Sequence, residues 1–130
     1  METVDLGLSV LWTKGSCIGV STFEEALALQ QDGFRLPRLG EVMDLLTFCW
    51  RKWDREYGCL KVKSDIGTSI LLPPEEGREC EWGRIWTSTE VFLDGSPWAK
   101  ALFFNAQTAD IELVPTSMLC AVRLVKDRNH

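Results

Sequence analysis

The side chains that could do acid–base, nucleophilic or metal chemistry are few in kind in this chain of 130 residues. Its one histidine is His130, so a Ser/His/Asp or Cys/His pair has no internal imidazole to use. Among 19 Asp and Glu residues two can always be nominated as a glycosidase-like pair, so their number alone indicates no active site. We therefore expect no catalytic residues, no metal site and no cofactor.

The five cysteines are an odd set with no CxxC pair and no zinc-like spacing, so at least one is unpaired within a monomer. Buried structural thiols are the commonest explanation for such residues, with a disulfide or a reactive thiol as alternatives. The residues concerned are Cys17, Cys49, Cys59, Cys80 and Cys120.

A second group of side chains could bind a ligand rather than transform one. Trp98 follows the turn-forming run Asp94-Gly95-Ser96-Pro97, where a large aromatic ring has less reason to be buried, although packing in the core is the alternative. Polar side chains on or beside the same predicted strands could supply contacts around this ring. The predicted binding residues are Trp98, Lys100, Thr87, Thr89 and Asn105.

Other prominent residues are better explained by structure. Arg35 and Glu41 are expected to form an ion pair that fixes an extended segment on a helix, and Arg123 is expected to be a satisfied structural charge. Four tryptophans lie at apolar periodic positions and are predicted to be core: Trp12, Trp50, Trp53 and Trp86. An acidic run between Pro-Pro and Gly-Arg is interpreted as an exposed loop rather than a cation site: Glu75, Glu76, Glu79 and Glu81.

Composition places the chain among globular proteins of one domain, residues 1–130, with 45% hydrophobic and 25% charged residues. The formal net charge of −5 and the pI near 4.9 disfavour nucleic acid and anionic lipid as partners unless a local basic patch exists. No run approaches the ~20 apolar residues of a membrane helix, and no secretory signal is recognisable, so we expect no membrane insertion.

The elements that must position these residues begin with a strand, because apolar residues alternate from Val4 to Trp12. A capping box of Ser21 and Glu24 predicts a first helix, which Gly33 ends. After an extended segment at 34–37, a second helix is predicted as far as Gly58, because apolar residues recur at helical spacing. These residues are Val42, Leu45, Leu46, Cys49, Trp50, Trp53 and Tyr57.

From Leu60 onward, short runs of β-branched and aromatic residues alternate with Gly, Pro and Asp. The turns Asp65-Ile66-Gly67, Asp94–Pro97 and Thr108-Ala109-Asp110 predict antiparallel neighbours. Two helices followed by strands predict an α+β fold with two helices packed on a mainly antiparallel twisted sheet. The predicted strands are Leu60–Val62, Ser69–Leu72, Arg84–Ser88, Ala99–Phe104, Ile111–Val114 and Leu119–Val125.

Five blocks occur in the order Val4–Trp12, Arg35-Leu36-Pro37, Thr68–Pro73, Trp86–Glu90 and Ala121-Val122-Arg123. In this order the chain resembles the Fibrobacter succinogenes major paralogous domain family, itself similar to the sulfatase-modifying-factor branch of C-type-lectin-like folds. The resemblance implies a C-type-lectin-like fold and a non-catalytic, metal-independent module of a bacterial or phage surface-type protein. Its implied partner is a protein or a glycan, in the cell envelope or outside the cell. The resemblance also implies that Cys17 and Cys49 are neighbours.

Two further hypotheses remain open at this point. The chain could be the variable, target-binding protein of a diversity-generating retroelement, a class that uses the same fold and accumulates Asn, Tyr, Ser and Asp at mutable positions. One tyrosine and two asparagines, Asn105 and Asn129, make that signal weak. The other hypothesis is a small carboxylate-dependent hydrolase, which requires a clustered pair of acids in a deep pocket with a raised pKa.

Overall fold

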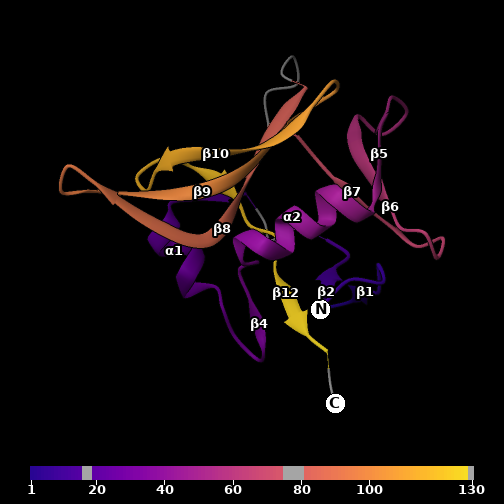
Figure 1. Cartoon of the computed structure of the whole chain (residues 1–130), viewed down its shortest axis with the longest axis horizontal. Helices are drawn as coiled ribbons and strands as arrows, with labels where there is room; N and C mark the ends of the chain where they lie inside the picture. Colours follow the sequence, from indigo (N-terminus) through magenta and orange to yellow (C-terminus); the bar gives the residue numbers. More distant parts are fainter. Residues whose placement is uncertain (16–18, 75–80, 129–130) are drawn as a thin grey trace.

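The computed structural model describes residues 1–15, 19–74 and 81–128. Strands make up 50% of it and helices 13%, and the strands form three sheets (Figure 1). The expectation of a C-type-lectin-like α+β fold, with two helices packed on a mainly antiparallel sheet, is therefore wrong. The physical reason is that residues predicted as helix or turn pair with neighbouring strands instead. The described chain therefore contains two short helices and three sheets.

The first sheet brings the two ends of the described chain together. Its strand order is β1-β2-β12-β4, and every neighbouring pair is antiparallel. The predicted strand from Val4 to Trp12 is interrupted, because Gly7 adopts a φ of +73° in a turn between β1 and β2. The strands are β1 (Thr3–Val4), β2 (Val10–Thr13), β4 (Phe34–Arg35) and β12 (Val125–Asp127).

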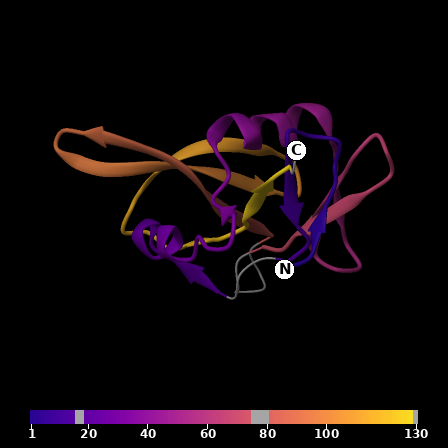
Figure 2. The same ribbon diagram turned by 90° about the horizontal axis from the view of Figure 1, so that it is seen from below.

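The central sheet has the order β10-β9-β8-β11-β3, in which β11 runs parallel to β8 and the other pairs are antiparallel. Asp94 and Gly95 both have positive φ and form a two-residue turn, so β8 and β9 are longer than predicted. Their hairpin projects from the body of the molecule (Figure 2). The strands are β3 (Val20–Ser21), β8 (Trp82–Leu93), β9 (Ser96–Asn105), β10 (Ala109–Pro115) and β11 (Cys120–Ala121).

The third sheet contains the largest departure from the sequence prediction. Its antiparallel strands are β5 (Trp50–Asp54), β6 (Cys59–Lys63) and β7 (Ser69–Leu72), in that order. Helix α2 (Leu39–Phe48) ends before them, whereas the apolar stripe predicted a helix as far as Gly58. The segment becomes a strand because Trp is a good strand former and because five residue pairs with β6 outweigh a marginal helical stripe.

The two helices begin differently from the sequence prediction. Helix α1 (Phe23–Ala28) is capped by Thr22 and Glu25, one residue later than the predicted box of Ser21 and Glu24. The Thr22 hydroxyl accepts the Glu25 amide at 3.3 Å, and the Glu25 carboxylate accepts the Thr22 amide at 2.9 Å. At the start of α2, the side chain of Glu41 accepts the backbone N–H of Arg38 at 2.8 Å.

Two apolar clusters lie on opposite faces of the β8–β9 pair. On one face Ile85, Leu102 and Phe104 pack with residues of α2, the first sheet and the third sheet. On the other face Trp86 and Ala101 pack with α1 and with residues around β11. Both faces of the central sheet are thus buried near the middle of β8, as is usual for a core strand.

The Arg35–Glu41 ion pair joins β4 to α2. The Arg35 guanidinium donates to the Glu41 carboxylate at 2.8 and 2.7 Å, and also to Asp127 of β12 at 2.8 Å. Both side chains of the pair are largely buried, at 18% and 11% exposed. Burial alone would raise the pKa of Glu41, but hydrogen bonds from Arg35 and from the Arg38 amide lower it overall. The carboxylate is therefore more stable in the folded chain than in the unfolded one.

Arg123 lies in the loop between β11 and β12 and is only 1% exposed. Its guanidinium donates to the carbonyl oxygens of Thr13 at 3.0 Å and Lys14 at 3.3 Å, at the end of β2. It also donates to the carbonyl oxygen of Leu71 in β7. One side chain therefore connects all three sheets, consistent with the structural role expected from the sequence.

The charge of Glu41 gives stability that depends on pH. Because its folded pKa is lowered, the contribution is complete above the unfolded pKa, near 4.5, and is lost as pH falls through the folded value. We expect Glu41→Gln to lower the free energy of unfolding by about 3 kcal/mol at pH 7, with the difference shrinking below about pH 4. Urea unfolding at pH 7 and pH 3 measures both values.

The matched control is Glu112→Gln, because Glu112 pairs with Arg84 at 3.0 Å on a more exposed surface. Its expected cost is below about 1 kcal/mol. Equal costs for the two variants at pH 7, or a Glu41→Gln cost that persists at pH 3, would contradict the role given to this ion pair.

Candidate functional site

The binding residues predicted around Trp98 do not form one site. Thr87 is completely buried, and its hydroxyl donates to the carbonyl oxygen of Lys100 at 2.8 Å. The same hydroxyl accepts the amide of Thr89 at 3.3 Å, where the register between β8 and β9 shifts. Thr87 therefore stabilises the backbone where the register of β8 and β9 shifts. Because its side chain is buried, Thr87 cannot contact a surface ligand, which corrects the sequence prediction for this residue.

Trp98 and Asn105 lie too far apart along β9 to share a ligand of ordinary size. They are seven positions apart in β9, roughly 23 Å at the rise of an extended strand. Trp98 is half-buried and pairs with Val91 and Pro115, and Lys100 is half-buried beside it on the same face. Of the predicted binding residues, only Asn105 lies at the cleft between β5 and the β9–β10 turn.

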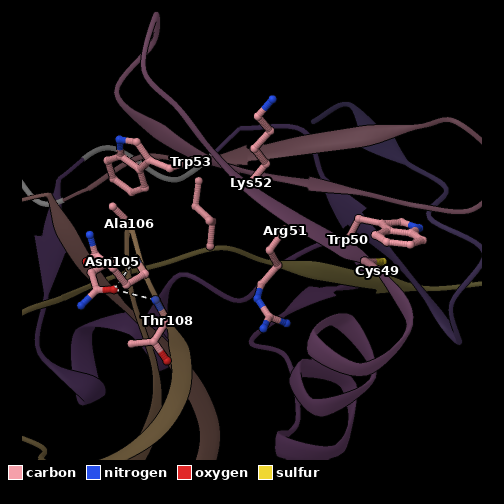
Figure 3. Close-up of a pocket in the computed structure, with 10 residues that line it drawn as sticks. Cys49, Trp50, Arg51, Lys52, Trp53, Asn105, Ala106 and Thr108 are labelled. Carbon is pink, nitrogen blue, oxygen red and sulfur yellow. Dashed lines mark hydrogen bonds between the residues drawn. The ribbon is translucent and has the colours of Figure 1, made fainter.

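A cleft of about 270 Å³ lies between β5 and the turn that connects β9 to β10 (Figure 3). One wall is the edge strand of the third sheet, and the opposite wall is the turn at the end of the central sheet. Its lining consists of Cys49, Trp50, Arg51, Lys52, Trp53, Leu60, Asn105, Ala106, Gln107 and Thr108.

The walls of the cleft are held by local hydrogen bonds and packing. Trp53 is half-buried, and its ring packs against the apolar cluster of α2 and the first and third sheets. Arg51 donates to the carbonyl oxygen of Leu46 in α2 at 2.8 Å. Across the cleft the Asn105 side chain accepts the amides of Gln107 and Thr108 at 2.8 and 2.7 Å, which fixes the turn. The cleft is thus an aromatic and polar hollow.

The hydrogen-bond pattern of β6 shows which backbone N–H and C=O groups of β5 are not paired with β6. The Ser64 amide, just after β6, donates to the carbonyl oxygen of Thr68 at 2.8 Å, so Ser64 directs its backbone polar groups toward β7. These groups alternate in direction along a strand. Lys61 and Lys63 therefore direct theirs toward β5.

The register then fixes the direction for β5. Trp50 and Lys52 are the partners of those lysines and direct their backbone groups toward β6. Arg51 and Trp53 must direct their N–H and C=O groups to the opposite side. Among the described residues β5 pairs only with β6, so these groups lie on an open sheet edge beside the cleft.

The outer face of this sheet is basic in an acidic protein. Lys52 and Lys63 are exposed there and Lys61 is half-buried, and the three share one face by register. None of them forms an ion pair with an acidic residue of the described chain. Trp50 lies on the same face, is 71% exposed, and donates to Asp65 at 3.2 Å. Its predicted core position is therefore wrong.

The titratable groups around the cleft give little for catalysis. Among the described residues, no Asp or Glu lines it. Burial raises the pKa of the Cys49 thiol, with a further contribution from Asp65, so this free thiol is held protonated. Burial similarly raises the pKa of Cys59. In residues 1–15, 19–74 and 81–128, no group of three His, Cys, Asp or Glu side chains could hold a metal ion.

Several sequence predictions lie outside the described residues. Cys17 and Cys80 are among them. The expected proximity of Cys17 to Cys49 therefore stays a prediction. Most of the acidic run is outside as well, namely Glu75, Glu76 and Glu79, whereas Glu81 is described and exposed.

Sequence reasoning missed the cleft because it assigned Trp50–Asp54 to a helix. A usable signal was present in the partner strand, where Lys61 and Lys63 alternate with the buried Leu60 and Val62 just after Gly58. This alternation predicts a strand, and a strand must pair with another one. Residues 50–54, which precede it in the chain, could have been predicted as that partner.

Comparisons of the chain with protein-family models, curated proteins and solved structures found no match. The resemblance to the Fibrobacter succinogenes major paralogous domain family therefore stays a prediction. Neither described helix has the length and apolar character needed to cross a membrane.

The two tryptophans of β5 should differ in their effect on stability. Trp53→Ala removes a half-buried ring from the core and should lower the free energy of unfolding by about 2–3 kcal/mol. Trp50→Ala removes an exposed ring with one hydrogen bond and should cost less than about 1 kcal/mol. Equal losses in urea melts would show that β5 does not present these faces as described.

Proposed function

We propose that this chain is a non-catalytic, metal-independent protein-binding module that holds an extended segment of its partner alongside β5. The bound segment lies in the cleft between β5 and the β9–β10 turn. The observation that carries the proposal is an open strand edge, at Arg51 and Trp53, that borders a hollow with an aromatic wall.

Strand addition suits this geometry for a physical reason. An edge strand presents unpaired N–H and C=O groups, and an extended segment can satisfy them with main-chain hydrogen bonds. Four consecutive residues of β5, 50–53, line the cleft, and Figure 3 shows the Trp53 ring there. A strand added along β5 would therefore lie in the cleft and place alternate side chains beside that ring. Main-chain pairing gives affinity, and the cleft gives specificity.

A glycan is the other partner class that the sequence left open. A sugar stacks on an exposed aromatic ring but makes no systematic use of a row of peptide N–H and C=O groups. Trp53 is half-buried, and Trp98 lies on the central sheet, away from the cleft. Trp50 is an exposed ring at the cleft, but it lies on the outer face, its indole N–H donates to Asp65, and one ring leaves the row of open backbone groups unused. The open edge therefore favours a protein segment over a glycan.

The hydrolase hypothesis finds no support around this cleft, where the described lining residues include no carboxylate. Among the described carboxyl groups, the pKa values of Asp5, Glu25 and Glu41 are lowered, whereas a general acid needs a raised pKa. No feature of the described residues favours the retroelement hypothesis over an ordinary binding module.

A proline placed on the open edge tests the proposal. Arg51→Pro removes an N–H that an added strand needs, whereas Arg51→Ala removes only the side chain and serves as the control. Peptides of about ten residues are selected by phage display on the immobilised chain, and their affinities are measured by fluorescence anisotropy. We expect Arg51→Pro to bind them about tenfold more weakly than Arg51→Ala.

A second measurement leaves the protein unchanged and covers the case in which the proline variant fails to fold. Each selected peptide is made in two versions that carry N-methyl groups at alternate residues, in opposite phases. A strand that pairs along one edge should lose binding in one phase and keep it in the other. Equal binding of the two phases, or selection of no peptide at all, would contradict strand addition.

A further inference from the structure

We infer that the segment bound along β5 alternates acidic with apolar residues. This inference rests on the proposed function and specifies the partner's chemistry. Side chains of an added strand alternate between the two faces of the sheet. Those on the outer face lie beside Trp50 and Lys52, and those on the other face lie beside Arg51 and Trp53.

The outer face selects acidic side chains. A residue opposite Lys52 has its Cβ about 5 Å from that of the lysine, and Lys61 and Lys63 lie one strand further on. These lysines have no ion-pair partner among the described acidic residues. The nearby Asp54 carboxylate is occupied by the amides of Glu56 and Tyr57, at 3.0 and 3.2 Å.

Local charge supports the same conclusion. Residues 50–72 contain five Lys or Arg and three Asp or Glu, whereas the whole chain has a net charge of −5. The third sheet is therefore a basic region of an acidic molecule. Opposite charges directly across two strands stabilise pairing by roughly 0.2–1 kcal/mol, and like charges destabilise it.

The other face selects apolar side chains. The Trp53 ring forms the accessible aromatic part of that wall, and Leu60 lies next to it in the cleft. The Arg51 guanidinium is turned to the carbonyl oxygen of Leu46, which takes one of its donors away from a ligand. Arg51 is exposed, so an apolar residue of the partner can cover Trp53 while the guanidinium stays in contact with water.

A second copy of this chain does not fit the same edge. Pairing β5 with β5 would bring the basic faces of two copies together, with Lys52 of each beside Trp50 or Lys52 of the other. Edge lysines are a common protection against such association. An acidic partner removes this repulsion, so the same side chains reject self-pairing and select the partner.

Labelled peptides of equal length test the inference by anisotropy: alternating Glu-Val, alternating Thr-Val, alternating Lys-Val, and Glu and Val in two blocks. We expect the alternating Glu-Val peptide to bind about fivefold more tightly than Thr-Val, and the block and Lys-Val peptides to bind more weakly still. Lys52→Glu should remove this preference and improve binding of Lys-Val. Lys14→Glu, at an exposed lysine after β2, is the control and should change nothing.

The outcomes separate the inference from the function on which it rests. Equal binding of Glu-Val and Thr-Val, with only one N-methylation phase tolerated, would overturn the acidic pattern and leave strand addition intact. Tight binding of Glu-Val in both N-methylation phases, or of the block peptide equally well, would show charge attraction without pairing and would overturn both. If the Lys52→Glu variant prefers Glu-Val over Thr-Val as strongly as the native chain does, the assignment of the partner's acidic side chains to the outer face is overturned.

Discussion

One buried guanidinium determines how the three sheets fit together. Arg123 donates to carbonyl oxygens at the end of β2 and in β7, from a loop that connects the central sheet to the first sheet. A charge removed from water is tolerated only when its donors are satisfied, so this loop has little freedom to move. This contact links β7, and through its ladder β5, to the end of β2. The cleft depends on it because its two walls belong to different sheets.

A small sheet with an open edge is stable here because its other surfaces are covered. Leu60, Val62, Ile70 and Leu72 point into the apolar cluster shared with α2 and the central sheet. The outer face carries lysines, which keep it soluble and discourage uncontrolled pairing at the edge. Among the described residues, this arrangement leaves one row of backbone N–H and C=O groups of β5 unpaired, and this row borders the cleft. The structural explanation of the lysines therefore agrees with the proposed function: the side chains that protect the free protein are those that we propose select its partner.

The sequence predicts the second half of the fold better than the first. Hairpins of the third and central sheets follow from Asp65-Ile66-Gly67 and from Asp94-Gly95, whose turn chemistry is local. Trp50–Asp54 was missed because its tryptophans continue the stripe of α2, and only pairing with β6 reveals a strand. The cleft was missed for a related reason. Its walls, at 50–53 and 105–108, are far apart in sequence, whereas the predicted group around Trp98 was chosen from neighbours along one hairpin.

Residue-resolved amide exchange is the most direct test of the central claim that β5 is an open edge which binds by strand addition. In the free chain the amides of Arg51 and Trp53 should exchange quickly, and those of Trp50 and Lys52 slowly, because only the latter pair with β6. Saturation with the alternating Glu-Val peptide should slow Arg51 and Trp53 selectively. Protection that instead appears on β10, or slow exchange at Arg51 and Trp53 in the free chain, would contradict the account.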